Sequence, residues 1–447
     1  MTPTAPAADH RLENLAVVAP RPEPQTLEDT GLSADLITQL ILKTLHFSGA
    51  ITGSALAAKL GLSHSSIEPI LSQLKLTHLC QVIASGALGG PSFVYRITDA
   101  GRSRAILFLE QNHYVGVAPV PFVQYEHYMK TFAAAMPKTA TRERVRQAFR
   151  HLVLSERVLD QLGPAINGAH SLFVYGPPGN GKTVIAQGIQ NILDGVIAIP
   201  HAIETDGQII QVFDPVAHQP VETAASGGGI DLGEGLDRRW VYCRRPMLTV
   251  GGELEVSSLE LSFSPTSKFY KAPVQMTANG GVLVIDDFGR QRCSPVDLLN
   301  RWITPLESRT DYLTLETGQK LPVPFVILIV FATNLKPTDL VDEAFLRRIH
   351  YKVFAENPTR ADFKLIFERC CYDRGIPYEE PVVDHLLQTY FDPRGLLPRG
   401  CHPRDLIDQA ISLADYLGEP HRITEKLLAA ACDSYFVDDP AAARKPA

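Results

Sequence analysis

The chain has 447 residues, which is enough for two or three domains of roughly 150 residues each. Hydrophobic residues make up 45% and charged residues 20% of the sequence, so the composition excludes a fibrous or wholly disordered protein. The formal net charge of −7 provides no general attraction to nucleic acid or to an anionic membrane. The longest apolar run, residues 325–332, is too short to cross a bilayer, and residues 1–20 lack a signal-peptide pattern. We therefore expect a cytoplasmic protein without membrane insertion.

The cysteines indicate a reducing environment. There are 7 of them, an odd number, and no two have the CxxC spacing of a zinc site. We expect reduced thiols and neither a disulfide framework nor a zinc site.

The N-terminal third begins with a polar tail and continues as a small folded module. Residues 1–31 are rich in Pro, Ala and Thr without apolar periodicity, which predicts a disordered tail. From Leu32 the apolar spacing predicts three helices, and two strands at 81–84 and 93–98 predict a β-hairpin followed by another helix. Residues 32–112, including the stretch YRITDAGR, resemble a winged-helix domain.

Winged helices often bind DNA through their third helix, which requires basic and polar side chains on that helix. Residues 32–112 contain six basic and four acidic residues, and the third helix carries only Lys75 against Glu68. This charge is too small for a strong phosphate footprint. The segment therefore favours docking to a protein over binding to DNA.

The remaining chain divides into a linker, a catalytic core and a C-terminal subdomain. Residues 113–137 carry aromatic side chains between prolines and are predicted to form an extended linker. Residues 138–355 alternate apolar strands with helical patterns, which predicts an α/β core with a parallel sheet. Residues 356–447 contain four amphipathic segments separated by Pro and Gly, and predict a small helical lid and a C-terminal tail.

A phosphate-binding loop lies between a short apolar strand at 171–175 and a helical pattern at 184–193. Its sequence fits GxxxxGK[ST] and consists of Gly176, Pro177, Pro178, Gly179, Asn180, Gly181, Lys182 and Thr183. Glycines at such a turn let backbone N–H groups point toward a phosphate, and the helix N-terminus adds partial positive charge. We expect ATP here, with Lys182 on the β- and γ-phosphates and the Thr183 hydroxyl on Mg²⁺.

Two aspartates follow a second apolar strand. Residues 282–285 are all apolar, as in a strand buried on both faces, and Asp286 and Asp287 come directly after them. Active sites of α/β proteins lie at the carboxyl ends of parallel strands. We expect Asp286 to hold Mg²⁺ and Asp287 to orient or deprotonate the attacking water.

A third apolar strand, residues 325–331, leads to Asn334. An asparagine at the end of a strand beside the metal strand can hydrogen-bond both the water and the γ-phosphate, although it can also simply form a turn. Shortly afterwards, the segment DEAFLRR places Arg347 and Arg348 at the end of a predicted helix.

Together these motifs resemble AAA+ ATPases: GPPGNGKT is similar to Walker A, VLVIDD to Walker B, FATN to sensor 1 and DEAFLRR to the segment with the arginine finger. The resemblance spans residues 142–433. It implies a homo-oligomeric ring, usually a hexamer, in which Arg347 or Arg348 reaches the nucleotide of the next subunit. In the predicted lid, CHPRDL resembles sensor 2 and implies a γ-phosphate contact from Arg404, unless a nearby acid such as Asp405 pairs with it.

The sequence also departs from the family pattern. Asp287 stands where a longer glutamate is usual, which predicts slow or partner-stimulated hydrolysis. Lys182 and Asp286 are 104 positions apart, which indicates an insertion at about 200–270. A predicted hairpin at 311–324 before the sensor 1 strand resembles the pre-sensor-1 hairpin clade, which includes MoxR-like chaperones and sigma-factor activators. The GAFTGA element of the activators is absent.

We conclude from the sequence that the chain is an oligomeric Mg²⁺-dependent ATPase that remodels or chaperones an unknown protein client. Two alternatives stay open: a winged-helix DNA-binding regulator controlled by ATP, and a nucleotide-dependent scaffold. Salt-dependent DNA binding by the N-terminal module separates the DNA-binding regulator from the remodelling ATPase, and stimulation of ATP hydrolysis by candidate proteins or by DNA separates all three hypotheses.

Overall fold

The computed structural model describes residues 18, 22–86, 89–136, 138–168, 171–193, 195–221, 235–340 and 343–436. The chain divides into two compact units, which are treated separately below. Unit 1 comprises Met1–Thr139, Leu193–Val284 and Gln291–Ile329, and unit 2 comprises Ala140–Ile192, Ile285–Arg290 and Val330–Ala447. Among the helices of the described ranges, none combines the length and the apolar character needed to cross a membrane.

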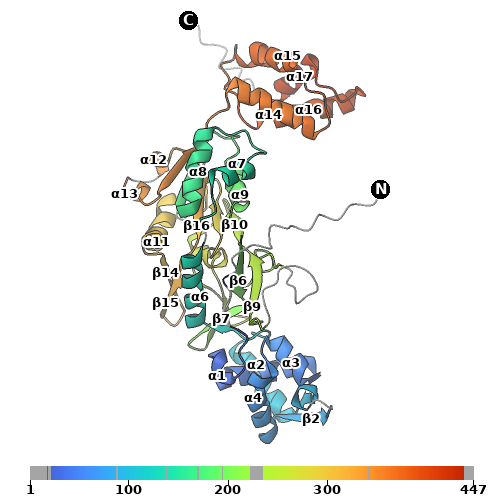
Figure 1. The fold of residues 1–447 in the computed structure, drawn as a ribbon, viewed down its shortest axis with the longest axis vertical. Helices are drawn as coiled ribbons and strands as arrows, with labels where there is room; N and C mark the ends of the chain where they lie inside the picture. The colour runs from blue at the N-terminus through green and yellow to red at the C-terminus, as the bar shows by residue number, and fades with distance from the viewer. Residues whose placement is uncertain are drawn as a thin grey trace. The chain divides into compact units, whose positions relative to one another are not determined.

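The N-terminal module of unit 1 contains five helices around a three-stranded sheet with the order β1-β3-β2 (Figure 1). Serine and threonine side chains cap the N-termini of α2, α3, α4 and α5, as the sequence pattern of these helices requires. The elements are α1 (Leu27–Thr30), α2 (Ala34–Ser48), β1 (Ala50–Thr52), α3 (Gly53–Leu60), α4 (His64–Leu76), β2 (Cys80–Ala84), a 3₁₀ turn (Gly90–Ser92), β3 (Val94–Ile97) and α5 (Asp99–Gln111).

The predicted tail is shorter than residues 1–31. Thr26 and Asp29 form a capping box at the start of α1, and Thr30 at its end is fully buried. The Pro24 carbonyl accepts hydrogen bonds from the Ser63 and Ser66 hydroxyls, each at 2.7 Å. These contacts attach residues 24–30 to the module, and sequence periodicity missed them because a one-turn helix is too short to show it. Residues 1–17 and 19–21 lie outside the described residues.

The predicted linker at 113–137 is also corrected by the structure. After the short strand β4 (Val120–Pro121), residues Phe122–Ala135 form a helix, α6. Its Tyr125, Tyr128 and Phe132 are buried in a core with strands of the insertion. Aromatic spacing therefore reflects a packed helix face, and the module continues into the rest of unit 1 without a linker. Pro137 is not among the described residues.

A second sheet has the order β11-β12-β8-β7-β4, and all of its strands except β4 come from the insertion at about 200–270. Ala202 and Ile209 of this sheet belong to the same apolar core as α2–α5, so the N-terminal module and the insertion share one core. The strands are β6 (Val196–Pro200), β7 (Ala202–Thr205), β8 (Gln208–Gln211), β9 (Trp240–Arg244), β11 (Ser262–Ser264) and β12 (Phe269–Lys271), and β6 pairs with β9. Residues 222–234 of the insertion lie outside the described residues.

The predicted hairpin before the third strand is confirmed as β14 (Thr310–Thr314) and β15 (Lys320–Pro324), paired antiparallel. Its far end is attached to the inserted sheet, because the Glu316 N–H donates to the Tyr270 hydroxyl at 3.0 Å and Gln319 donates to Asp206. The hairpin is preceded by a 3₁₀ turn (Val256–Leu259) and the helices α10 (Val274–Thr277) and α11 (Pro295–Ser308).

The α/β architecture predicted for the core is present, with a five-stranded parallel sheet of the order β10-β13-β16-β5-β17. Three of its strands, β5, β13 and β16, are buried over most or all of their length, which matches their continuous apolar sequences. The strands are β5 (Ser171–Tyr175), β10 (Met247–Val250), β13 (Val282–Ile285), β16 (Leu328–Thr333) and β17 (Tyr351–Phe354), and the accompanying helices are α7 (Arg142–Ala148), α8 (Glu156–Gly168), α9 (Lys182–Gln190), α12 (Pro337–Leu340) and α13 (Glu343–Leu346).

The C-terminal part of unit 2 is a helical lid with its own apolar core (Figure 1). The amphipathic segments of the sequence correspond to α14 (Arg360–Asp373), α15 (Glu380–Leu386) with a π-helical continuation (Leu387–Phe391), α16 (His402–Leu417) and α17 (Glu425–Tyr435). Residues 437–447 are outside the described ranges.

Candidate functional site

The phosphate-binding loop joins β5 to α9 through three glycines with positive φ. Gly176, Gly179 and Gly181 have φ values of 145°, 83° and 72°, which favour residues without a Cβ. Gly176 also has no room for a side chain, because a Cβ there would lie 2.4 Å from the Ala355 carbonyl oxygen. Gly181 is the N-cap of α9, and as a glycine it has no side-chain oxygen to cap the helix. The free N–H groups at the helix start therefore remain available to an anion.

Lys182 is held at the base of this loop. Its Nζ donates to the carbonyl oxygens of Pro177 at 2.8 Å and Gly176 at 3.1 Å, and the residue is 8% exposed. Burial lowers the Lys182 pKa, and the positive charge of Arg399 adds to this, while the carboxylates of Asp287 and Asp286 oppose it. The lysine thus lies in a cationic region bordered by two acids, as a site for a phosphate and a metal ion requires.

Thr183, in the first turn of α9, contacts Asp286, which directly follows β13. The Thr183 hydroxyl donates to Asp286 Oδ2 at 2.8 Å, so the residue after Lys182 and the first residue after β13 share one hydrogen bond. Mg²⁺ prefers oxygen ligands and is commonly held by one or two protein oxygens plus substrate phosphates. These two oxygens fit such an ion. In the part of the chain that the structure describes, no larger cluster of His, Cys, Asp or Glu could hold a metal.

Asp287 has an unusual backbone conformation. Its φ of 47° is left-handed, which is rare for a residue with a side chain and costs about 1–3 kcal/mol. Asn334 Nδ2 donates to Asp287 Oδ1 at 3.2 Å, and the Phe288 N–H donates to the Ala332 carbonyl at 2.7 Å. The ends of β13 and β16 therefore bring the predicted water-positioning carboxylate and the predicted sensor asparagine together.

Of the three predicted arginines, Arg404 pairs with a neighbouring acid in the lid, and Arg347 and Arg348, which are predicted to act on a neighbouring subunit, lie just after α13. Arg404 pairs with Asp405 at 2.8 Å and has a side chain that is 62% exposed, which is the alternative that the sequence left open. Arg347 is exposed and Arg348 half-buried, both just after α13. Val341 and Asp342, the start of the DEAFLRR region, lie outside the described residues.

Another lid arginine, Arg399, lies against the loop at Gly179. The Cδ of Arg399 would be 3.7 Å from a Cβ on Gly179, and its charge acts on Lys182. Within the described chain, the Arg399 guanidinium makes no ion pair. Sequence reasoning missed this residue because it precedes the predicted helix and because its approach to the loop depends on how the lid turn packs on Gly179.

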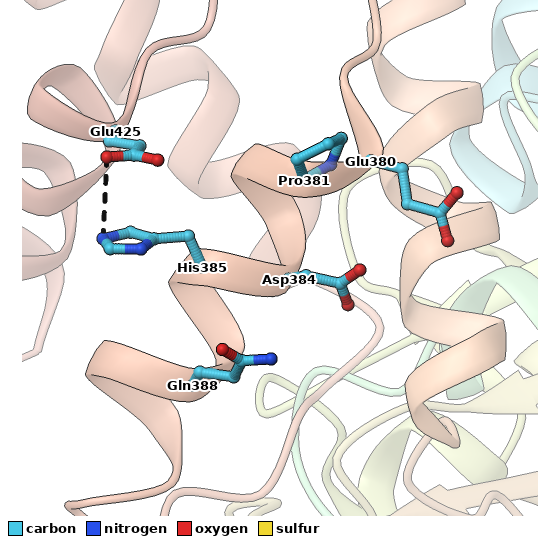
Figure 2. Close-up of a pocket in the computed structure, with 6 residues that line it drawn as sticks. All are labelled: Glu380, Pro381, Asp384, His385, Gln388 and Glu425. Carbon is cyan, nitrogen blue, oxygen red and sulfur yellow. Dashed lines mark ion pairs between the residues drawn. The ribbon is translucent and has the colours of Figure 1, made fainter.

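A separate pocket lies on the lid between α15 and α17 (Figure 2). It has a volume of about 470 Å³, and His385 Nε2 lies 3.7 Å from Glu425 Oε2 at one side. Its lining residues are Glu380, Pro381, Asp384, His385, Gln388 and Glu425, and none belongs to the phosphate-binding loop. Three carboxylates repel the phosphates of a nucleotide, so this pocket is not the nucleotide site.

Two parts of the chain match known protein families. Residues 151–212, which include the phosphate-binding loop, match the family described as magnesium chelatase, subunit ChlI. Residues 359–434, the lid, match a domain of unknown function, DUF8689. The first match supports an AAA+ ATPase core for this chain.

Solved structures also show similarity at low identity. A point mutant of RuvB from Thermotoga maritima has 15% identity and a TM-score of 0.38, and the match covers 68% of this chain and 75% of that chain. The Thermotoga maritima RuvB Holliday junction branch migration motor has 15% identity and a TM-score of 0.36, covering 64% of this chain and 71% of that chain. No curated protein matches the sequence.

Proposed function

We propose that this AAA+ chain is an ATPase that binds Mg·ATP at the phosphate-binding loop of unit 2 and hydrolyses the γ-phosphate. The observation that carries the proposal is the 2.8 Å hydrogen bond from the Thr183 hydroxyl to Asp286. It brings together a helix N-terminus suited to phosphates and a carboxylate suited to Mg²⁺. Thr183 and Asp286 would hold the ion, which supplies charge neutralisation for the phosphates.

In this proposal, the protein side chains divide the work of hydrolysis. Lys182 and the backbone N–H groups of residues 179–183 bind the phosphate oxygens, and Asn334 helps to orient the attacking water. Asp287 orients that water and accepts its proton, because its carboxylate is the one held by Asn334. The left-handed backbone at Asp287 compensates for its short side chain by fixing where the carboxylate points.

The proposed assembly is a homo-oligomeric ring, in which an arginine after α13 reaches the nucleotide of the neighbouring subunit. Arg347 is the better candidate for an arginine finger acting on a neighbouring subunit, because it is exposed while Arg348 is half-buried. Hexamers are usual among the proteins that these motifs resemble, and a hexameric ring is part of the proposal.

The proposed client is a protein, and the N-terminal module is proposed to be a winged-helix domain that docks to it. Exposed positions of α4 include Ser65, Glu68, Gln73 and Leu76, which leaves one acid and no base among them. A duplex-binding helix needs several phosphate contacts from basic or polar groups. The surface of α4 therefore supports protein docking and a remodelling role of the MoxR-like type.

The lid is proposed to contribute Arg399 to the γ-phosphate in place of Arg404. We expect Arg399→Ala to weaken binding of an Mg·ATP analogue about tenfold, because a charged hydrogen bond is worth roughly 1.5–3 kcal/mol. Arg404→Ala is the matched control and should change the affinity by less than about twofold. Isothermal titration calorimetry measures both. The reverse order would show that the Arg404–Asp405 pair opens when nucleotide binds, and would restore Arg404 as sensor 2.

The proposed function itself is tested by nucleotide binding. We expect the full chain to bind an Mg·ATP analogue, and Lys182→Ala to weaken that binding about 100-fold, because a charge-assisted contact to two phosphates is lost. Calorimetry measures the affinity, and Lys352→Ala is the control. This substitution also removes a lysine, but Lys352 Nζ donates to the carbonyls of Leu346 and Ile349 and not to the loop, so nucleotide binding should be retained. If the wild-type chain binds no nucleotide, the proposal is wrong.

A further inference from the structure

The side chain of Asn180 joins three parts of unit 2. Its Nδ2 donates to Asn357 Oδ1 at 2.9 Å and to the Ala355 carbonyl at 3.3 Å, just after β17. Its Oδ1 accepts a hydrogen bond from the Gly400 N–H at 3.1 Å, just before α16 of the lid. The residue is 9% exposed. Both polar ends of this amide are therefore engaged by protein groups and are not available to phosphate oxygens.

The lid turn at residues 399–401 lies directly against the loop at this point. A Cβ on Gly179 would be 2.5 Å from Cys401 Sγ, and a Cβ on Gly400 would be 3.3 Å from the Gly179 carbonyl oxygen. Larger residues at either position would push the turn away from the loop. The two glycines and the Asn180 hydrogen bonds thus set a single close placement of this turn.

Charge opposes this placement when the loop holds no anion. Arg399 is the neighbour of Gly400, and its Cδ would lie 3.7 Å from a Cβ on Gly179, in the same loop as Lys182. The positive charges of Arg399 and Lys182 repel each other. An anion bound between them attracts both side chains and so removes this opposition. Hydrogen bonds between neutral groups, such as those of Asn180, are not affected in this way.

We propose that Asn180 is a positioning residue that holds the lid turn on the phosphate-binding loop and thereby places Arg399 beside Lys182. The proposal rests on the proposed nucleotide site for its catalytic consequence, but the contact itself exists without nucleotide. The Asn180 side chain acts through Arg399 and does not itself contact the phosphates. A bound triphosphate then tightens the lid contact, so that occupancy of the loop controls the position of the lid.

The contact is tested first by hydrogen–deuterium exchange on the full chain without nucleotide. We expect Asn180→Ala to speed exchange in a peptide covering residues 396–404 about tenfold, because the Gly400 N–H loses its acceptor. Asn357→Ala leaves the loop sequence intact and should speed exchange in the same peptide about threefold, because Asn180 loses its hydrogen bond to Asn357. Asn191→Ala, at the exposed end of α9, should leave it unchanged. Wild-type exchange in Asn180→Ala would overturn the proposal.

The dependence on Arg399 is tested by a double-mutant cycle measured as affinity for an Mg·ATP analogue. If Asn180 acts through Arg399, the variant with both Asn180→Ala and Arg399→Ala binds no more weakly than Arg399→Ala alone. A merely structural role predicts losses that multiply, and that result would overturn the proposal. Absence of nucleotide binding by the wild type would refute the proposed function, while the exchange experiment would still decide whether Asn180 holds the lid.

Discussion

Asp287→Asn should lower the rate of ATP hydrolysis by about 100-fold or more while leaving nucleotide affinity equal or slightly tighter. General-base catalysis contributes roughly 10²–10⁴-fold, and an amide cannot accept the proton that the carboxylate accepts. Affinity is retained because the Thr183–Asp286 pair and Lys182 are untouched, and because one negative charge near the phosphates is removed. A coupled ATPase assay gives the rate, and calorimetry gives the affinity of the same preparation.

The control for this substitution is Asp339→Asn, which changes an exposed aspartate of α12 in the same unit. We expect it to retain both hydrolysis and nucleotide binding. An unchanged kcat in Asp287→Asn would show that another group orients the water, and Asp286 or a residue from a second subunit would then have to be considered. A loss of affinity as large as the loss of rate would instead place Asp287 among the groups that hold the metal ion.

The parts of the site that the sequence predicted are those encoded by contiguous motifs. Residues 176–183 and Asp286 follow buried strands, and the order of strands in a parallel sheet brings their ends together. Arg404 was selected by the same local reasoning, but its nearest acid, Asp405, is adjacent in the chain and pairs with it. Arg399 could not be distinguished in advance, since its position depends on how the lid turn packs on Gly179.

The fold shows the same limit at α6. Pro119 and Pro121 indicate a break in regular structure, and they indeed precede the helix, with Pro121 as its N-cap. The aromatic residues that follow were assigned to a linker because their periodicity alone does not show which surface covers them. The structure shows the covering partners: the Ala198 N–H donates to the Tyr128 hydroxyl at 2.8 Å. The Tyr128 ring also packs on Trp240, which is 112 positions away in the chain.

Arg239→Ala should destabilise unit 1 by about 3–5 kcal/mol, the usual cost of breaking a buried ion pair by removing one partner. The side chains of Arg239 and Asp237 are 2% and 1% exposed, and Arg239 NH2 lies 2.7 Å from Asp237 Oδ2. Arg239 NH1 also donates to the Thr30 carbonyl at 2.8 Å, and NH2 donates to Gln124 Oε1 at 3.2 Å. Loss of the Arg239 side chain leaves the Asp237 carboxylate buried without its partner. It also removes one hydrogen bond to α1, at Thr30, and one to α6, at Gln124.

Urea unfolding followed by tryptophan fluorescence measures this effect, because both tryptophans of the chain, Trp240 and Trp302, belong to unit 1. Arg238→Ala is the matched control: this neighbouring arginine has a side chain that is 47% exposed and pairs with Glu23. An exposed pair contributes about 0–1 kcal/mol, so the control should shift the unfolding free energy by no more than that. Equal effects of the two substitutions would show that burial of the Arg239–Asp237 pair does not determine the stability of unit 1.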